Sequence, residues 1–141
     1  MNLHQIIYAS HSLVPMRRED LLELLAQSRR DNAAAGITGL LLHADGSFIQ
    51  TIEGEFTAVQ SLFARIEHDP RHGGIILIAD EPIARRSYGD WSMAFREISR
   101  DDAARLPGFQ QGERSISAQE RDLARSLMHT FFKTSGLTQH G

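Results

Sequence analysis

The sequence predicts an α+β sandwich in which two helices cover one face of a five-stranded mixed sheet. Alternating apolar residues, typical of strands, and 3.6-residue periodicity, typical of helices, succeed one another over the first part of the chain. The order of these patterns is βαββαβ followed by one more strand. A last helical pattern near the C-terminus has its own apolar face, which needs a surface to cover.

The first strand and the first helix come before Gly36. Residues 2–10 alternate as a strand, with Tyr8 on the face that meets the helices. A helix follows over about residues 17–32 and stops at Gly36. Its inner face is apolar at the start and becomes polar towards Asn32.

A hairpin forms the middle of the predicted sheet. Asp45-Gly46 is the strongest hairpin signal in the chain, and a two-residue turn there pairs Leu41 with Gln50 on a shared face. Gln50 is then an amide in an apolar strand, where an unpartnered polar group is costly. We therefore expect a partner for Gln50, from the protein or from a ligand. The same face carries Leu41, His43, Phe48, Gln50 and Ile52, and the other face carries Leu40, Leu42, Ile49 and Thr51.

A second helix and two strands complete the sheet. Thr57 opens a capping box, and residues 57–69 follow helical spacing up to Pro70. Residues 75–78 form an apolar run suited to a strand buried on both faces, and residues 91–98 alternate as a fifth strand. This order is that of a ferredoxin-like sandwich. One side of the fifth strand carries Trp91, Met93 and Phe95.

The chain divides into two parts. Residues 1–98 contain the elements above, and residues 99–141 form an extension that starts with a polar, broken segment. A second capping box at Ser117 opens a helix over about residues 118–133. We expect this helix to cover the bare sheet face, in its own chain or in a partner's. Its apolar face carries Leu123, Leu127, Met128, Phe131 and Phe132.

Composition excludes several classes of protein. A net charge of −3 with scattered basic residues indicates no nucleic-acid surface, and the absence of cysteine excludes disulfides and thiolate metal sites. No apolar run approaches the ~20 residues of a membrane helix, and no signal-peptide pattern is present. We expect a cytoplasmic protein that binds neither nucleic acid nor membranes. His68 and His72 have the spacing of a helical metal pair, but Pro70 breaks the helix, so no metal site is predicted.

Three polar side chains reach the gap between the helices and the sheet, namely Tyr8, Asn32 and Gln50. A phenol and two amides include no activated acid, base or nucleophile, so they make a poor hydrolytic site. They suit a flat heterocycle with alternating carbonyls and ring nitrogens, because an amide both donates and accepts hydrogen bonds. Spacing alone also allows an ordinary polar core in which these groups satisfy their neighbours.

Six short motifs, in unbroken order over residues 2–98, resemble the BLUF family of blue-light sensors that use FAD. The motifs are Ile-Tyr8-Ala-Ser, Arg-Asp-Asn32, Gly-Ile-Thr-Gly-Leu-Leu, Phe-Ile-Gln50-Thr-Ile-Glu-Gly, Asp69-Pro-Arg-His72 and Trp91-Ser-Met93. The resemblance implies a photoreceptor without enzymatic activity. It also implies that FMN or riboflavin could replace FAD, because the adenine and phosphates project towards solvent.

The resemblance further implies roles for individual residues. Gln50 bonds both the flavin and Tyr8, and Asn32 holds the pyrimidine side of the ring. Excited flavin draws an electron from Tyr8 and a proton follows through Gln50, whose amide then rotates or changes tautomer and shifts the absorption to the red. An ionised Asp31 cannot donate a hydrogen bond to the flavin, so no flavin-binding role is assigned to it, and it is expected either to point outwards or to contact the ribityl hydroxyls. The implied cofactor-binding residues are Tyr8, Leu24, Ser28, Asn32, Ile37, Leu41, Phe48, Gln50, Arg65, Ile66, Asp69 and His72.

The implied signal leaves through the fifth strand. Either Trp91 or Met93 approaches Gln50 there, and the strand moves the helix at 118–133 or the surface that it forms. The extension is too short for a cyclase or phosphodiesterase domain. We therefore expect the output to be an effector protein or a change within a homo-oligomer.

Overall fold

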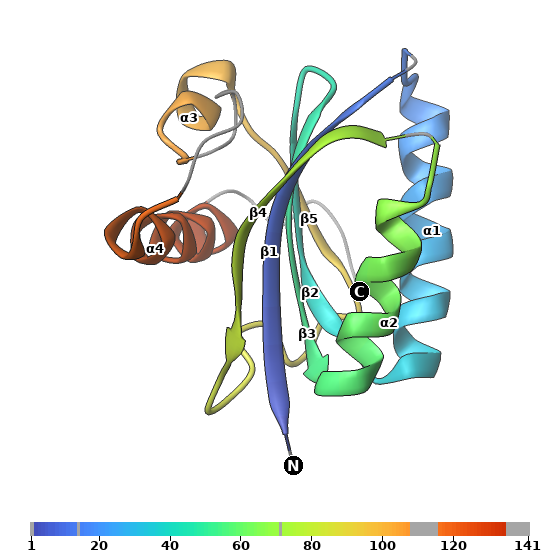
Figure 1. The fold of residues 1–141 in the computed structure, drawn as a ribbon. Coiled ribbons are helices and arrows are strands. Elements are labelled where there is room, and N and C mark those ends of the chain that lie inside the picture. Colours follow the sequence, from blue (N-terminus) through green and yellow to red (C-terminus); the bar gives the residue numbers. More distant parts are fainter. Residues whose placement is uncertain (1, 14, 71, 108–115, 135–141) are drawn as a thin grey trace.

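Five strands form a single mixed sheet in the order β4-β1-β3-β2-β5 in the computed structural model of the chain (Figure 1). Neighbouring strands run antiparallel except β2 and β5, which are parallel. The strands are β1 (Leu3–Ser12), β2 (Thr38–Ala44), β3 (Ser47–Glu55), β4 (His72–Pro82) and β5 (Ala94–Glu97). The structure describes residues 2–13, 15–70, 72–107 and 116–134.

Helices cover both faces of this sheet (Figure 1). One face carries α1 (Arg18–Ala35) and α2 (Phe56–Glu67), and the other carries α3 (Arg100–Ala104) and α4 (Ala118–Thr134). The predicted sandwich is therefore confirmed, and the C-terminal helix covers the bare face within its own chain. No helix in the described ranges is long and apolar enough to cross a membrane.

The β2–β3 hairpin has the predicted register. Its two-residue turn uses the left-handed conformations of Asp45 (φ 49°) and Gly46 (φ 82°), as a type I′ turn requires. Leu41 pairs with Gln50, as predicted. Because successive residues point to opposite faces, Leu41 joins the core beneath α1 and α2, whereas Leu42 joins the core beneath α4.

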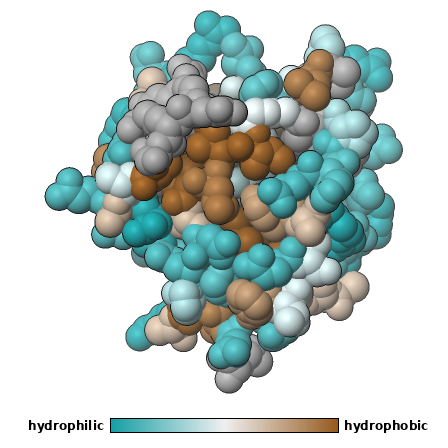
Figure 2. Space-filling model, in the orientation of Figure 1, coloured by the Kyte–Doolittle hydropathy of each residue, from teal (hydrophilic) through white to brown (hydrophobic). Residues whose placement is uncertain are grey.

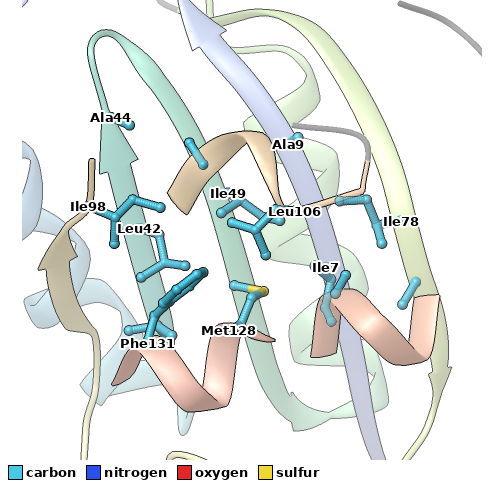
Figure 3. Packing of buried hydrophobic residues seen from close by; sticks show 14 of the residues in the cluster. Ile7, Ala9, Leu42, Ala44, Ile49, Ile78, Ile98, Leu106, Met128 and Phe131 are labelled. Carbon is cyan, nitrogen blue, oxygen red and sulfur yellow. The ribbon is translucent and has the colours of Figure 1, made fainter. Parts of the chain in front are cut away.

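The core beneath α4 is apolar and continuous (Figure 3). Met128 and Phe131 of α4 form one cluster with Leu42 and Ile49 of the hairpin, and Leu106, which follows α3, joins them. Burial of a side chain of this size contributes roughly 1.5–3 kcal/mol. α4 is therefore packed on the sheet as a layer of the fold.

The edge of the sheet at β4 is more open. Among the described residues β4 pairs with β1 alone, and its Leu77 is 45% exposed. Figure 2, in the orientation of Figure 1, shows apolar surface gathered over the middle of this view, where β1 and β4 run. An apolar edge strand of this kind is a surface for further contacts.

One of the two predicted capping boxes is confirmed. The backbone N–H of Ser117 donates to the Glu120 carboxylate and that of Glu120 donates to the Ser117 hydroxyl, both at 3.1 Å. The box at Thr57 is wrong. α2 begins at Phe56, and the Glu55 carboxylate takes the cap by accepting from the Thr57 N–H at 3.3 Å.

The C-terminal half differs from the expectation in four places. β4 has 11 residues, far more than the predicted 75–78, whereas β5 has only 4. α3 is not predicted by periodicity, because a helix of 5 residues is too short to show one. Leu123 is 48% exposed, and Ala124 takes the buried position on α4 that Leu123 was expected to hold.

We predict that Gly39→Ala strongly destabilises the sheet. A Cβ at Gly39 would overlap the backbone carbonyl of Thr51 on the neighbouring strand, so the hairpin must open to admit it. We expect the free energy of unfolding in urea to fall by about 2 kcal/mol or more. Gly89→Ala is the control, because its Cβ makes only ordinary contacts with Arg86, and it should change stability by less than about 0.5 kcal/mol. Equal stabilities would contradict the close approach of the strands.

Candidate functional site

A cleft of about 190 Å³ opens between α1, α2 and the sheet face that they cover. Most residues assigned to the cofactor by the sequence line it, namely Tyr8, Leu24, Ser28, Asn32, Leu41, Phe48, Gln50, Arg65, Ile66 and Asp69. Ile37 is instead buried in the adjoining core, and the side chain of His72 lies outside the described part of the structure. The walls also contain residues that the sequence did not assign, namely Ser10, Gln27, Asp31 and Leu62.

A hydrogen bond between Tyr8 and Gln50 lies in the wall of this cleft. Tyr8 on β1 is directly paired with Gln50 on β3, so both side chains leave adjacent strands on the same face. The Tyr8 hydroxyl donates to Gln50 Oε1. The strand register alone brings together two residues from separate elements.

Tyr8 is held as a neutral phenol. Its side chain is 3% exposed and packs against the ring of Phe63 at 5.4 Å between centroids. Burial raises the pKa of Tyr8 well above its usual value of about 10, and the negative charge of Asp69 raises this pKa further. Tyr8 is therefore protonated at neutral pH and stays so in alkali that would ionise an exposed tyrosine, and its hydroxyl donates to Gln50.

The other end of the Gln50 amide contacts a sulfur atom. Gln50 Nε2 donates to Met93 Sδ at 3.4 Å. A thioether is a weak acceptor, whereas the Tyr8 hydroxyl is a strong donor to the amide oxygen. The orientation of Gln50 therefore depends mainly on Tyr8, and its contact with Met93 can change at small cost.

Three successive backbone carbonyls of residues 91–93, here called the relay segment, are each held by a donor from another element. The hydrogen bonds are Gly39 N to Trp91 O (3.1 Å), Asn32 Nδ2 to Ser92 O (2.8 Å) and Arg29 Nε to Met93 O (2.9 Å). Asn32 and Arg29 both belong to α1, so the helix that walls the cleft also holds the segment beside Gln50. The sequence did not identify Arg29, although its i, i+3 spacing from Asn32 places both on one helix face.

Trp91 and Met93 lie on opposite sides of the sheet, which corrects the expectation that they share a face. Met93 is fully buried beneath α1 and α2. Trp91 packs against the core beneath α4, where it meets the ring of Phe132 edge-on at 6.0 Å. Strand alternation does not apply here, because the relay segment bends before β5 begins at Ala94. Met93 is therefore the residue next to Gln50.

The chemistry of the cleft fits a flavin ring. The amides of Asn32 and Gln50 can accept from and donate to a heterocycle with carbonyls and ring nitrogens. Leu24 and Ile66 offer apolar walls from the two helices, as sites for flat ligands usually have. Asp31 adds a carboxylate, which accepts but does not donate hydrogen bonds when ionised. Within the described ranges, no group of three His, Cys, Asp or Glu residues could hold a metal.

The comparisons with known proteins agree with this chemistry. A family model described as "BLUF: Sensors of blue-light using FAD" matches residues 3–94. Subunit beta of the photoactivated adenylate cyclase of Euglena gracilis is 39% identical over 92 residues, which are 64% of this chain and 11% of that protein. The chain thus spans about a tenth of the length of this relative.

Two solved structures match nearly the whole chain. The dark-state structure of BlrB, a BLUF protein, has a TM-score of 0.70 and 32% identity, covering 92% of this chain and 94% of that one. The photo-activated state of BlsA has a TM-score of 0.75 and 25% identity, covering 97% and 99%. Both structural matches cover more of the chain than the family match over residues 3–94. They therefore include part of the C-terminal extension.

We predict that Tyr8→Phe makes stability less sensitive to alkali. An unfolded tyrosine ionises near pH 10, whereas burial raises the pKa of folded Tyr8 above this value. The contribution of Tyr8 to the free energy of unfolding is therefore fully present below about pH 10. It is lost as pH rises further, by up to about 1.4 kcal/mol per pH unit. Urea unfolding between about pH 8 and about pH 11 should show a steeper loss for wild type than for Tyr8→Phe. Identical slopes would mean that Tyr8 ionises equally in both states.

Proposed function

The chain belongs to the BLUF family of blue-light sensors that use FAD, and we propose that its Tyr8 and Gln50 convert absorbed blue light into a new pattern of hydrogen bonds. The observation that carries this proposal is the hydrogen bond from Tyr8 to Gln50 in the wall of the cleft. Burial favours the neutral phenol. A neutral phenol that donates to Gln50 supports Tyr8 as the group that gives up an electron and a proton together.

FAD is the family's cofactor, and we assign its ring to the cleft between α1 and α2. Gln50 would contact the ring beside Tyr8, and Asn32 would hold its pyrimidine side. Arg65 and Asp69 line the same cleft and offer polar groups to the ribityl chain. The apolar contacts would come from Leu24, Leu41, Phe48 and Ile66.

A bound flavin supplies the absorption of blue light and, when excited, a strong one-electron oxidant. Tyr8 is the electron donor, and its proton moves along the existing hydrogen bond to Gln50 Oε1. The electron and the proton both return to Tyr8, so no net charge is created. Gln50 is left rotated if Oε1 gives back the proton that it received, and it is left as the imidic acid tautomer if Oε1 keeps that proton and a proton from Nε2 is given up in its place.

Either change in Gln50 alters its contact with Met93. Rotation replaces the donating Nε2 by Oε1 beside Met93 Sδ, and the imidic acid tautomer leaves Nε2 with one proton fewer. The amide-to-sulfur hydrogen bond is lost in the first case and weakened in the second. The relay segment thus has two arrangements that the state of Gln50 can bias, as transmission requires.

We assign residues 1–98 to the photosensor and residues 99–141 to its output, towards an effector protein or within a homo-oligomer. The open edge at Leu77 supports a further protein contact. The central pair of the cleft, a phenol and an amide, supports a sensor and not an enzyme. The cyclase named for the relative belongs to a protein about nine times longer than the matched part.

We predict that the purified protein is yellow and that blue light shifts its flavin absorption reversibly to the red. Tyr8→Phe should abolish the shift and leave the flavin bound, because only the electron and proton donor is lost. Tyr88→Phe is the matched control, since Tyr88 is also buried but lies in the core beneath α4, and it should keep the shift.

The same spectra separate the alternatives. A flavin enzyme would instead show reduction of the flavin that depends on a substrate, and a colourless protein would exclude a bound flavin. A normal red shift in Tyr8→Phe would contradict the proposed role of Tyr8.

We predict that FMN and riboflavin support the same red shift as FAD. The photoactive contacts lie at the ring, so the phosphates and adenine should add little affinity. When flavin-free protein is reconstituted, the dissociation constants of FAD, FMN and riboflavin should differ from one another by less than about tenfold, that is by less than about 1.4 kcal/mol of binding free energy. Binding of FAD more than about a hundredfold tighter than riboflavin would show that the phosphates or the adenine are recognised.

A further inference from the structure

Guanidinium groups hold α4 to the sheet at two places within the described ranges, one in its N-terminal half and one in its last turn, and between them Thr51 Oγ1 on β3 donates to Met128 Sδ at 3.4 Å. Arg125 Nε donates to Gln5 Oε1 on β1 at 2.8 Å, and the same guanidinium pairs with the Glu81 carboxylate on β4. Gln5 is 1% exposed. Its strand is hydrogen-bonded to β3 on one side and to β4 on the other. This contact therefore ties α4 to a firmly held part of the sheet.

The second point is the last turn of α4. Arg96 Nη2 donates to the backbone carbonyl of Phe132 at 3.0 Å, and its guanidinium carbon lies 5.2 Å from the centre of the Phe132 ring. A cation is favourable there, because the last carbonyls of a helix carry partial negative charge. Arg96 is only 2% exposed, and its Nε has no hydrogen-bond partner within the described ranges. Because a buried charge depends on its remaining hydrogen bonds, the bond to Phe132 is sensitive to a small shift of β5.

Phe132 also contacts the relay segment. Trp91 of this segment meets the Phe132 ring edge-on at 6.0 Å, and Tyr88, which precedes the segment, does so at 5.2 Å. Trp91 lies two residues from Met93, which contacts Gln50 on the other side of the sheet. One short stretch of backbone thus joins the photoactive pair to the end of α4.

β5 is the strand best able to shift. It has 4 residues and lies at the edge of the sheet, where β2 is its one partner strand in the part of the chain that the structure describes. β1 is hydrogen-bonded on both sides along most of its length. A displacement that starts at Met93 therefore moves β5 and leaves β1 in place.

We propose that α4 is a lever that turns about Arg125 while Arg96 and Trp91 carry the movement of β5 to its last turn. Arg96 is a positioning residue, because it acts through Phe132 and touches neither flavin nor Gln50. The inference rests on the proposed function, since Gln50 must change for the relay segment to move. It assigns the light-dependent surface to the end of α4 around Phe132.

Hydrogen exchange measured by mass spectrometry tests this inference on the full chain with bound flavin, in darkness and under blue light. We expect amides of residues 129–133 to exchange about tenfold faster in the light, as the loss of one charge-assisted hydrogen bond predicts. Residues 119–125 should exchange equally in both conditions. The visible spectrum of each sample is recorded in parallel.

Two variants separate the anchors. Arg96→Met should keep the red shift, exchange quickly at 129–133 even in darkness, and show no further change in the light. Arg125→Met, the matched control, should exchange faster around its own position in both conditions and keep the light-dependent difference at 129–133. If Arg96→Met does not fold, Arg96→Lys keeps the charge but loses the planar fork, and its light-dependent difference should be smaller than in wild type.

Three results would overturn the lever. They are a light-dependent difference of wild-type size in the Arg96 variants, a difference confined to residues 119–125, and unchanged exchange of α4 in wild type despite a normal red shift. A wild-type protein with no red shift would instead refute the proposed function, and its spectrum identifies that case.

Discussion

The hydrogen bond from Tyr8 to Gln50 is the interaction on which the rest of this structure depends. It exists because β1 pairs directly with β3 in a register that places both side chains on one face. A slip of one residue would turn Gln50 to the α4 side and remove the Gln50 amide from the cleft. The helices then bury Tyr8, which raises the pKa of its hydroxyl, and that hydroxyl donates to the partly buried Gln50.

The sheet separates two layers with different tasks. The layer under α1 and α2 holds the cleft, whereas the layer under α4 is an apolar core closed by Met128 and Phe131. The relay segment crosses between these layers, with Met93 on one side and Trp91 on the other. The proposed signal from Gln50 to α4 would pass through the backbone of these three residues, and not through the packed strands in the middle of the sheet.

The elements predicted correctly are those whose signals are local. Asp45-Gly46 specifies a two-residue turn by its own backbone preference, and the register with Gln50 follows from that turn. The errors arise where a neighbour outside the local pattern decides the outcome. Glu55 displaces Thr57 as the cap of α2, and the bend before β5 sends Trp91 away from Met93.

The sequence by itself determined the α+β order, the C-terminal layer and the polar residues of the cleft, because periodicity, turn residues and short motifs are written along the chain. Only the tertiary structure decided that Met93 faces Gln50, that Arg29 holds the relay segment, and that Arg96 holds the end of α4. Each of these contacts joins residues 36 to 64 positions apart. Residues so far apart in the sequence come into contact only when the layers pack, so the local sequence pattern around either residue does not identify its partner.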